Sequence, residues 1–200
     1  MEAVAAFVLA GGRSSRMGSD KALLELGGRP LISRALELVS FVTSDVKIVG
    51  PPAKCQRFGT VIEDVYHDRG PLGGIHTALA NSQSDLNLVL GVDLPFVEPH
   101  FISHLTTIAR ASLAVVSVPY VDGHFQSLCA TYRKAFANIA EAALNEGKNK
   151  VDALFTSIPV RVISEDEIVS AGFSPGMFRN LNTRADWQQA QREFTQAPKI

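Results

Sequence analysis

Apolar and polar positions along the chain follow two alternating patterns. A continuous apolar run of strand length occurs at residues 3–10 and a highly apolar run at 86–92, and strands buried on both faces of a sheet have this composition. Between such runs lie stretches with apolar residues every three or four positions, the period of a helix that covers a sheet. The repeated alternation predicts an α/β fold with a mostly parallel central sheet.

The predicted strands are residues 3–10, 46–49, 61–62, 86–92, 113–118, 128–132 and 160–163. The predicted helices are stretches 30–39, 70–79, 99–108 and 136–144, with a last helix after Thr183. Thr183 is a suitable N-cap for that last helix because its hydroxyl can accept a backbone N–H. No low-complexity linker or internal repeat interrupts the 200 residues, so we expect one domain over residues 1–200.

Composition and charge restrict the class of protein. Hydrophobic residues make up 46% of the chain and charged residues 20%, as in ordinary globular proteins. Nineteen Lys and Arg residues against twenty Asp and Glu give a net charge of −1, which argues against a nucleic-acid binder. Cys55 and Cys129 lie far apart and form no metal or disulfide motif. The first apolar run is too short to span a bilayer and follows no basic segment, so we expect a cytoplasmic protein without membrane contact.

Ligands of parallel α/β sheets bind beyond the carboxyl ends of the strands, which directs attention to the loop after the first strand. It begins with two adjacent glycines, Gly11 and Gly12, and holds three cations, Arg13, Arg16 and Lys21. Adjacent glycines expose backbone N–H groups to an anion, and Arg and Lys bind phosphate oxygens. The spacing fits neither a Walker A loop nor a G-x-G-x-x-G fingerprint. The alternative is a solvated loop whose charges serve solubility.

Two carboxylates follow later strands. Asp93 ends the most apolar strand and is a candidate ligand for Mg²⁺; the alternative is a turn or helix-capping residue before Pro95. Asp64 could accept hydrogen bonds from a base or ribose, or could belong to a simple turn. His100 and His104 stand four apart, but no third ligand is evident, so we expect a surface or partly packed pair.

Four motifs occur in an order that resembles the MobA family of molybdenum cofactor guanylyltransferases. They are Leu9-Ala10-Gly11-Gly12 through Asp20-Lys21-Ala22-Leu23-Leu24, Gly70-Pro71-Leu72-Gly73-Gly74-Ile75, Asp93-Leu94-Pro95-Phe96, and Asn180-Leu181-Asn182-Thr183. The resemblance covers roughly residues 5–187. It implies a Rossmann-like three-layer sandwich of the nucleotide-diphospho-sugar transferase type.

The resemblance also implies roles for individual residues. Nucleotide-binding residues would be Leu9, Ala10, Gly11, Gly12, Lys21, Asp64 and Asp93. Catalytic residues would be Arg16, Lys21 and Asp93, with Asp93 also the ligand of Mg²⁺. Residues on the molybdopterin side would be Gly73, Asn180 and Asn182. The implied reaction transfers GMP from GTP to molybdopterin and releases pyrophosphate, and transient contact with molybdoenzymes or their chaperones is expected.

Two departures from the family pattern bear on this expectation. Gly50 stands where members often carry Asn, which would remove one hydrogen bond to guanine. Ser127 replaces the proline of a usual Gln-Pro-Leu sequence on the molybdopterin side. The alternatives are a CTP-using molybdopterin cytidylyltransferase or related nucleotidyltransferase, and a non-catalytic nucleotide-binding module.

Overall fold

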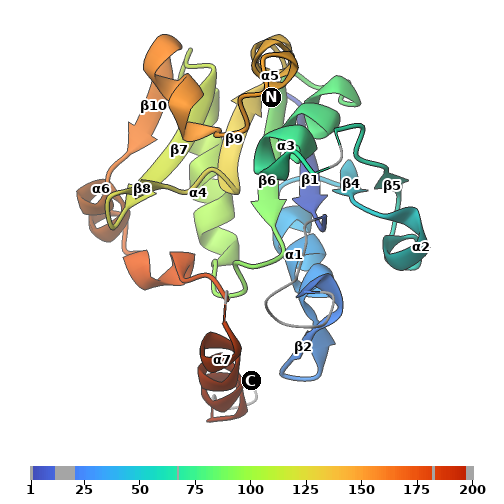
Figure 1. Cartoon of the computed structure of the whole chain (residues 1–200). Helices are drawn as coiled ribbons and strands as arrows, with labels where there is room; N and C mark the ends of the chain where they lie inside the picture. The colour runs from blue at the N-terminus through green and yellow to red at the C-terminus, as the bar shows by residue number, and fades with distance from the viewer. Residues whose placement is uncertain (1, 12–20, 67, 182, 197–200) are drawn as a thin grey trace.

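A central sheet runs through the molecule in the strand order β10-β7-β9-β6-β1-β4-β5 (Figure 1). The computed structural model describes residues 2–11, 21–66, 68–181 and 183–196. The strands are β1 (Val4–Leu9), β4 (Val46–Val49), β5 (Val61–Ile62), β6 (Leu86–Gly91), β7 (Val116–Val121), β9 (Cys129–Arg133) and β10 (Val160–Ile163). β8 (His124–Phe125) pairs with β7 at the side of this path.

The sheet is mostly parallel, as the alternation of strands and helices predicts. β1 pairs in parallel with β4 on one side and β6 on the other, and β4 pairs in parallel with β5. β9 runs antiparallel to both of its neighbours, β6 and β7. All six residues of β1 and of β6 are buried, because helices cover both faces of the sheet there.

Two helical layers enclose the sheet. α3 (Gly70–Ala80) and α5 (Phe136–Asn145) pack on one face, where Phe7, Ile75 and Phe136 share a core. α1 (Leu31–Ser40) and α4 (Pro99–Arg110) cover the other face around Val8, Ile32 and further buried residues. Figure 1 shows α3 in front of β6 and β1, with α1 and α4 behind them. The result is the three-layer sandwich implied by the resemblance.

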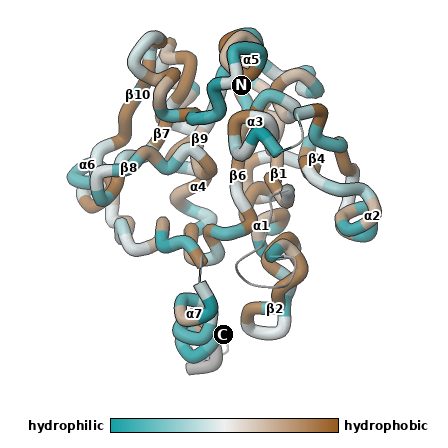
Figure 2. Tube along the Cα trace, in the orientation of Figure 1, coloured by the Kyte–Doolittle hydropathy of each residue, from teal (hydrophilic) through white to brown (hydrophobic). Residues whose placement is uncertain are grey.

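The last helix, α7 (Arg184–Gln196), lies beyond the carboxyl end of the sheet near the small hairpin of β2 (Glu25–Leu26) and β3 (Arg29–Pro30) (Figure 1). Figure 2 shows hydrophilic residues over much of α7. The Thr183 hydroxyl accepts the Asp186 N–H at 3.1 Å, and the Asp186 carboxylate accepts the Thr183 N–H at 2.8 Å. Thr183 is therefore the predicted N-cap.

One predicted strand is displaced. The apolar run predicts a strand over residues 113–118, but β7 runs from Val116 to Val121 and Leu113 is fully exposed. Asp122 and Gly123 both have positive φ, at 52° and 76°, and form the turn of a tight hairpin with β8. Such a turn requires paired strands up to its edge, so β7 extends to Val121.

Several short elements have no clear periodic signal in the sequence. They are the 3₁₀ turns η1 (Lys21–Leu23), η2 (Asp152–Ser157) and η3 (Pro175–Phe178), the helices α2 (Pro52–Cys55) and α6 (Glu165–Ser170), and the strands β2, β3 and β8. Among the residues described, the helices are all too short or too polar to cross a membrane.

Candidate active site

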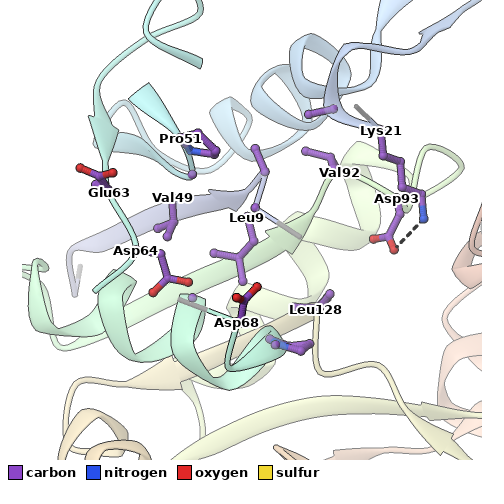
Figure 3. Close-up of a pocket in the computed structure, with 17 residues that line it drawn as sticks. Leu9, Lys21, Val49, Pro51, Glu63, Asp64, Asp68, Val92, Asp93 and Leu128 are labelled. Carbon is purple, nitrogen blue, oxygen red and sulfur yellow. Dashed lines mark hydrogen bonds and ion pairs between the residues drawn. The ribbon is translucent and has the colours of Figure 1, made fainter. Parts of the chain in front are cut away.

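A cavity of about 660 Å³ opens beyond the carboxyl ends of β1, β4 and β6 (Figure 3). The chain leaves β1 to build β4 and β5 on one side, and it later returns to place β6 on the other side. This arrangement makes the end of β1 a topological switch point, where ligands of open α/β sheets bind. The cavity is lined by Leu9, Ala10, Gly11, Lys21, Ala22, Val49, Gly50, Pro51, Glu63, Asp64, Asp68, Gly70, Pro71, Gly74, Val92, Asp93 and Leu128.

An ion pair stands at one end of this cavity. Lys21 Nζ lies 3.2 Å from Asp93 Oδ2, and the two side chains are only 20% and 23% exposed (Figure 3). Lys21 belongs to η1, whereas Asp93 follows β6 and its carbonyl accepts the Leu181 N–H. Lys21 is the one cation among the described residues that line the cavity. The pair places a positive and a negative charge where an anionic ligand and a metal ion could meet.

Gly91 makes room for the Asp93 carboxylate. A Cβ at position 91 would lie 2.7 Å from Asp93 Oδ1, too close for a real contact, and 3.2 Å from Leu128 Cβ, which is tight. The last residue of β6 must therefore lack a side chain if the carboxylate is to keep this position. The close approach of Gly91 fixes where the negative charge of Asp93 stands.

Carboxylates also line the opposite end of the cavity, where Glu63 and Asp64 are drawn in Figure 3. Asp64 Oδ1 accepts hydrogen bonds from the Thr77 hydroxyl at 2.8 Å and the Tyr66 N–H at 3.0 Å. These bonds hold the carboxylate against the C-terminal half of α3 and give it a structural role beside any contact with a ligand. Asp68 has a positive φ of 62°, which Asp tolerates better than most residues.

Apolar groups form the wall between the two ends. Leu9 and Val49 are buried at the ends of β1 and β4 and face the cavity together with Pro51 (Figure 3). A Cβ at Gly50 would come within 3.3–3.4 Å of Ala10 and Gly11. Glycine at this departure from the family pattern thus allows the end of β4 to pack closely against the end of β1. An apolar wall flanked by hydrogen-bonding groups suits a flat base.

A second cavity of about 410 Å³ adjoins the first. Both cavities are lined by Pro71, Asp93 and Leu128, so Asp93 stands where they meet. The remaining lining residues of the second cavity are Leu94, Phe125, Gln126, Ser127, Asn149, Lys150, Val151, Asp152 and Asn180. Two neighbouring cavities that share a charged residue can hold two ligands with their reacting ends together.

Most of the residues singled out from the sequence lie in these cavities. Leu9, Ala10, Gly11, Lys21, Asp64 and Asp93 line the first cavity, and Asn180 lines the second. Gly12, Arg16 and Asn182 lie outside the described residues. Gly73, expected on the molybdopterin side, lines neither cavity. A Cβ there would lie 2.9 Å from the Tyr66 carbonyl oxygen, so this glycine lets α3 pack against the preceding loop.

Other lining residues were not found from the sequence. Asp68 precedes the Gly-Pro entry of α3, and this position after a short strand is the signal that could have identified it. Lys150 and Asp152 lie just after the end of α5 in a stretch without apolar periodicity. Only the folding of η2 against the β8–β9 turn brings these two residues to the second cavity.

The described residues contain no group of three or more His, Cys, Asp and Glu side chains that could bind a metal by themselves. His100 is exposed, and His104 packs beside Phe101 and Phe173, in agreement with the expected surface or partly packed pair. A metal bound by Asp93 would need further ligands from substrate phosphates or water. Mg²⁺ is commonly bound in this way: one or two protein carboxylates coordinate it, and phosphate oxygens and water complete its octahedral coordination.

The switch-point cavity, the Lys21–Asp93 pair and the adjoining second cavity define a nucleotidyltransferase-type α/β domain. Residues 6–165 match the family described as the MobA-like NTP transferase domain. The chain belongs to this family.

Individual relatives agree with this assignment. The chain is 34% identical to a protein of Pelotomaculum thermopropionicum named "probable molybdenum cofactor guanylyltransferase", over 92% of this chain and 89% of the relative. It is 30% identical to the molybdenum cofactor guanylyltransferase of Desulfosudis oleivorans, over 96% of each chain. The crystal structure of molybdopterin-guanine dinucleotide biosynthesis protein A from Archaeoglobus fulgidus superposes with a TM-score of 0.83 at 24% identity, covering 95% of this chain and 98% of that one.

Proposed function

We propose that this chain transfers GMP from GTP to molybdopterin, forming molybdopterin guanine dinucleotide and pyrophosphate. Family membership and the named relatives support the reaction class and both substrates. The observation that carries the proposal is the position of Asp93, which lines both cavities and pairs with Lys21. Two substrates bound in the two cavities would have their phosphates beside these charges.

The first cavity is assigned to GTP. Leu9, Val49 and Pro51 supply the apolar wall for the base, with Ala10 and Gly11 at the turn after β1. Carboxylates at that end can accept hydrogen bonds from guanine, which presents adjacent N–H donors, or from the ribose hydroxyls. Lys21 would bind the phosphates. Gly12 and Arg16 complete the proposed loop, a role that rests on the resemblance of the first motif.

The second cavity is assigned to molybdopterin, with Asn180 on its wall. The phosphate of molybdopterin must reach the α-phosphorus of GTP, so it has to lie at the shared boundary near Asp93. Asn182 belongs to the same motif and is proposed for the same side.

Asp93 is the proposed ligand of Mg²⁺, and the donor set fits this ion. A carboxylate only 23% exposed at the boundary of two phosphate sites can bind the metal while substrate oxygens and water supply its other ligands. Mg²⁺ bound there would neutralise phosphate charge and favour attack at phosphorus.

The transfer itself is an in-line displacement. An oxygen of the acceptor phosphate forms a bond to the α-phosphorus, and the bond from that phosphorus to the α–β bridging oxygen breaks. Pyrophosphate leaves with the electron pair of the broken bond. The attacking oxygen is already anionic, so no general base is needed and the chain contributes position and charge. Lys21 would stabilise the negative charge that spreads over the phosphoryl oxygens.

Pyrophosphate release with GTP, Mg²⁺ and molybdopterin tests the proposal. We expect release only when all three are present, with GTP preferred over CTP in a direct competition. Preference for CTP would support the cytidylyltransferase alternative. Tight GTP binding without pyrophosphate release would support the non-catalytic module.

A further inference from the structure

We infer that Asp152, held in place by Ser127, selects the acceptor by accepting hydrogen bonds from the amino edge of a flat heterocycle bound in the second cavity. The inference rests on the proposed function because it assumes that the acceptor occupies this cavity. It adds a specificity-determining residue in a segment that the family motifs do not include.

The position of Asp93 sets the direction of the acceptor. The acceptor phosphate must lie at the boundary of the two cavities, which Pro71, Asp93 and Leu128 form. The rest of the acceptor then extends toward the residues that line the second cavity alone. Phe125 and Asp152 are among these residues, so they lie on the side to which the ring system extends.

A short hydrogen bond fixes the Asp152 carboxylate. The Ser127 hydroxyl donates to Asp152 Oδ1 at 2.5 Å. Ser127 is itself anchored, because the hydroxyl of the fully buried Tyr132 donates to its carbonyl oxygen at 2.8 Å. Burial raises the pKa of Tyr132 well above its usual value, and the nearby Asp152 carboxylate raises it further. Tyr132 therefore stays protonated and continues to donate this bond.

Aromatic packing joins the same two segments a second time. Phe125, two residues before Ser127, meets Phe155 edge to face with ring centroids 5.1 Å apart. Phe155 is buried in η2, the same 3₁₀ turn that begins with Asp152. The carboxylate and the apolar side chain of Phe125 thus belong to one wall held together by two contacts. Because this wall is already ordered before the ligand binds, binding loses no conformational entropy in ordering it, and the wall can discriminate between ligands.

The chemistry of this wall matches a 2-amino-4-oxo pyrimidine ring, such as that of a pterin. This ring presents an amino group and an adjacent ring N–H on one edge, both of them donors. A carboxylate offers only acceptors at neutral pH and can accept from both donors together. Lys150 also lines the cavity and supplies a cation for the anionic or carbonyl groups of the ligand. A 2-oxo ring would instead place an oxygen against the carboxylate and be rejected.

Steady-state kinetics on the full chain provide the first test. Asp152→Asn should raise the KM for molybdopterin about 10- to 100-fold, the usual range for hydrogen bonds to a charged group. Ser127→Ala should raise it less, since the carboxylate remains but loses its anchor. The KM for GTP should stay within about twofold in both variants. Glu141→Gln, an exposed change on α5 outside both cavities, is the matched control and should alter neither KM.

Ring binding gives a second test that needs no turnover. With GTP and Mg²⁺ present, fluorescence titration should show tighter binding of 6-hydroxymethylpterin than of 6-hydroxymethyllumazine, which carries oxygen in place of the 2-amino group. Asp152→Asn should remove this preference, because an amide can donate as well as accept.

Several results would overturn the inference: an unchanged KM for molybdopterin in Asp152→Asn, equal binding of the two rings by the native chain, or no binding of either ring. Failure of the proposed function would look different. In that case the native chain would not release pyrophosphate from GTP and molybdopterin, whatever its preference between the rings.

Discussion

Lys21 Nζ lies 3.2 Å from Asp93 Oδ2, although the two residues stand 72 positions apart in the chain. The contact joins the loop after β1 to the end of β6, the two strand ends that flank the switch point. It places one cation and one carboxylate at the boundary where both cavities meet. In the proposed transfer, Lys21 would bind phosphate oxygens and Asp93 would hold the Mg²⁺ beside them.

Lys21→Ala should lower kcat for pyrophosphate release about 10²- to 10³-fold, the usual cost of removing one electrostatic contact to a transition state. The fold should be retained, since Lys21 lies outside the hydrophobic core. Lys47→Ala is a suitable control because Lys47 pairs with Asp45 outside both cavities. Near-normal kcat in Lys21→Ala would show that this ammonium does not act on the reacting phosphate.

Gly91→Ala should impair transfer by moving the Asp93 carboxylate. The added methyl group would lie 2.7 Å from Asp93 Oδ1, and the carboxylate can give way more easily than the strand. We expect a fall in kcat and a higher Mg²⁺ requirement, with circular dichroism unchanged. Metal titrations of pyrophosphate release would measure this shift.

The same methyl group also approaches Leu128, so a loss of activity in Gly91→Ala could come from displacement of Asp93 or of Leu128. A double variant separates these two causes. If Leu128 is responsible, Gly91→Ala with Leu128→Gly, which removes both Leu128 Cβ and Cδ1, should recover activity relative to Gly91→Ala alone, with Leu128→Gly by itself as the reference. If Asp93 is responsible, the loss should persist. Gly176→Ala, where the added Cβ meets only the Ser174 hydroxyl at 3.4 Å, should behave like the native chain.

The part of the site that could be predicted from sequence lies at strand ends. β1 is a continuous apolar run and β6 is highly apolar, so the pattern places the residues that follow them, including Lys21 and Asp93, at one edge of a sheet. Their contact could not be predicted, because it depends on strand order and on the glycine at position 91. Sequence periodicity carries no information on either.

Most of the wall of the second cavity could not be predicted for a different reason, although the resemblance implied Asn180 and Ser127 on that side. Its wall depends on side-chain contacts between Ser127 and Asp152 and between Phe125 and Phe155, each joining the β8–β9 region to η2. Local pattern reveals elements long enough to repeat a hydrophobic period, and 3₁₀ turns of three to six residues are too short for that. The displaced start of β7 has the same origin, because an apolar run shows that a strand exists and does not show where pairing begins.

Glu167 should make stability depend on pH in the acidic range. The Arg161 guanidinium and then the Ser164 backbone N–H lower the pKa of Glu167 from 4.5 to about 2 in the folded chain. The unfolded chain therefore binds the proton more readily, and the stabilisation present above about pH 4.5 is lost as the pH falls toward 2. Because the carboxylate is 43% exposed, solvent screening limits this contribution to about 1 kcal/mol or less.

Urea unfolding of Glu167→Gln against the native chain would test this dependence. The variant should be less stable at pH 7, and the difference should shrink as the pH approaches 2. A difference that stays constant from pH 7 to pH 3 would show that the charge of Glu167 is not its cause. Glu141→Gln, an exposed change on α5, should show no comparable dependence.

Asp93→Asn should abolish metal-dependent transfer while leaving the fold intact, because the amide keeps the shape of the carboxylate and loses its charge. We expect pyrophosphate release with Mg²⁺ to fall at least about 10³-fold and Mn²⁺ binding in the presence of GTP to weaken in parallel. Near-normal turnover of Asp93→Asn with Mg²⁺ would show that the metal is bound elsewhere.

A double-mutant cycle of Lys21→Ala and Asp93→Asn tests whether the two residues act together on the same reacting phosphoryl group. If both stabilise charge on the same phosphoryl group, the combined variant should lose less activity than the product of the two single losses. Independent sites would instead give multiplicative losses. Binding of GTP alone provides the control, since Lys21→Ala should weaken it and Asp93→Asn should weaken it only when Mg²⁺ is present. This difference would separate direct phosphate binding by the ammonium from binding through the metal.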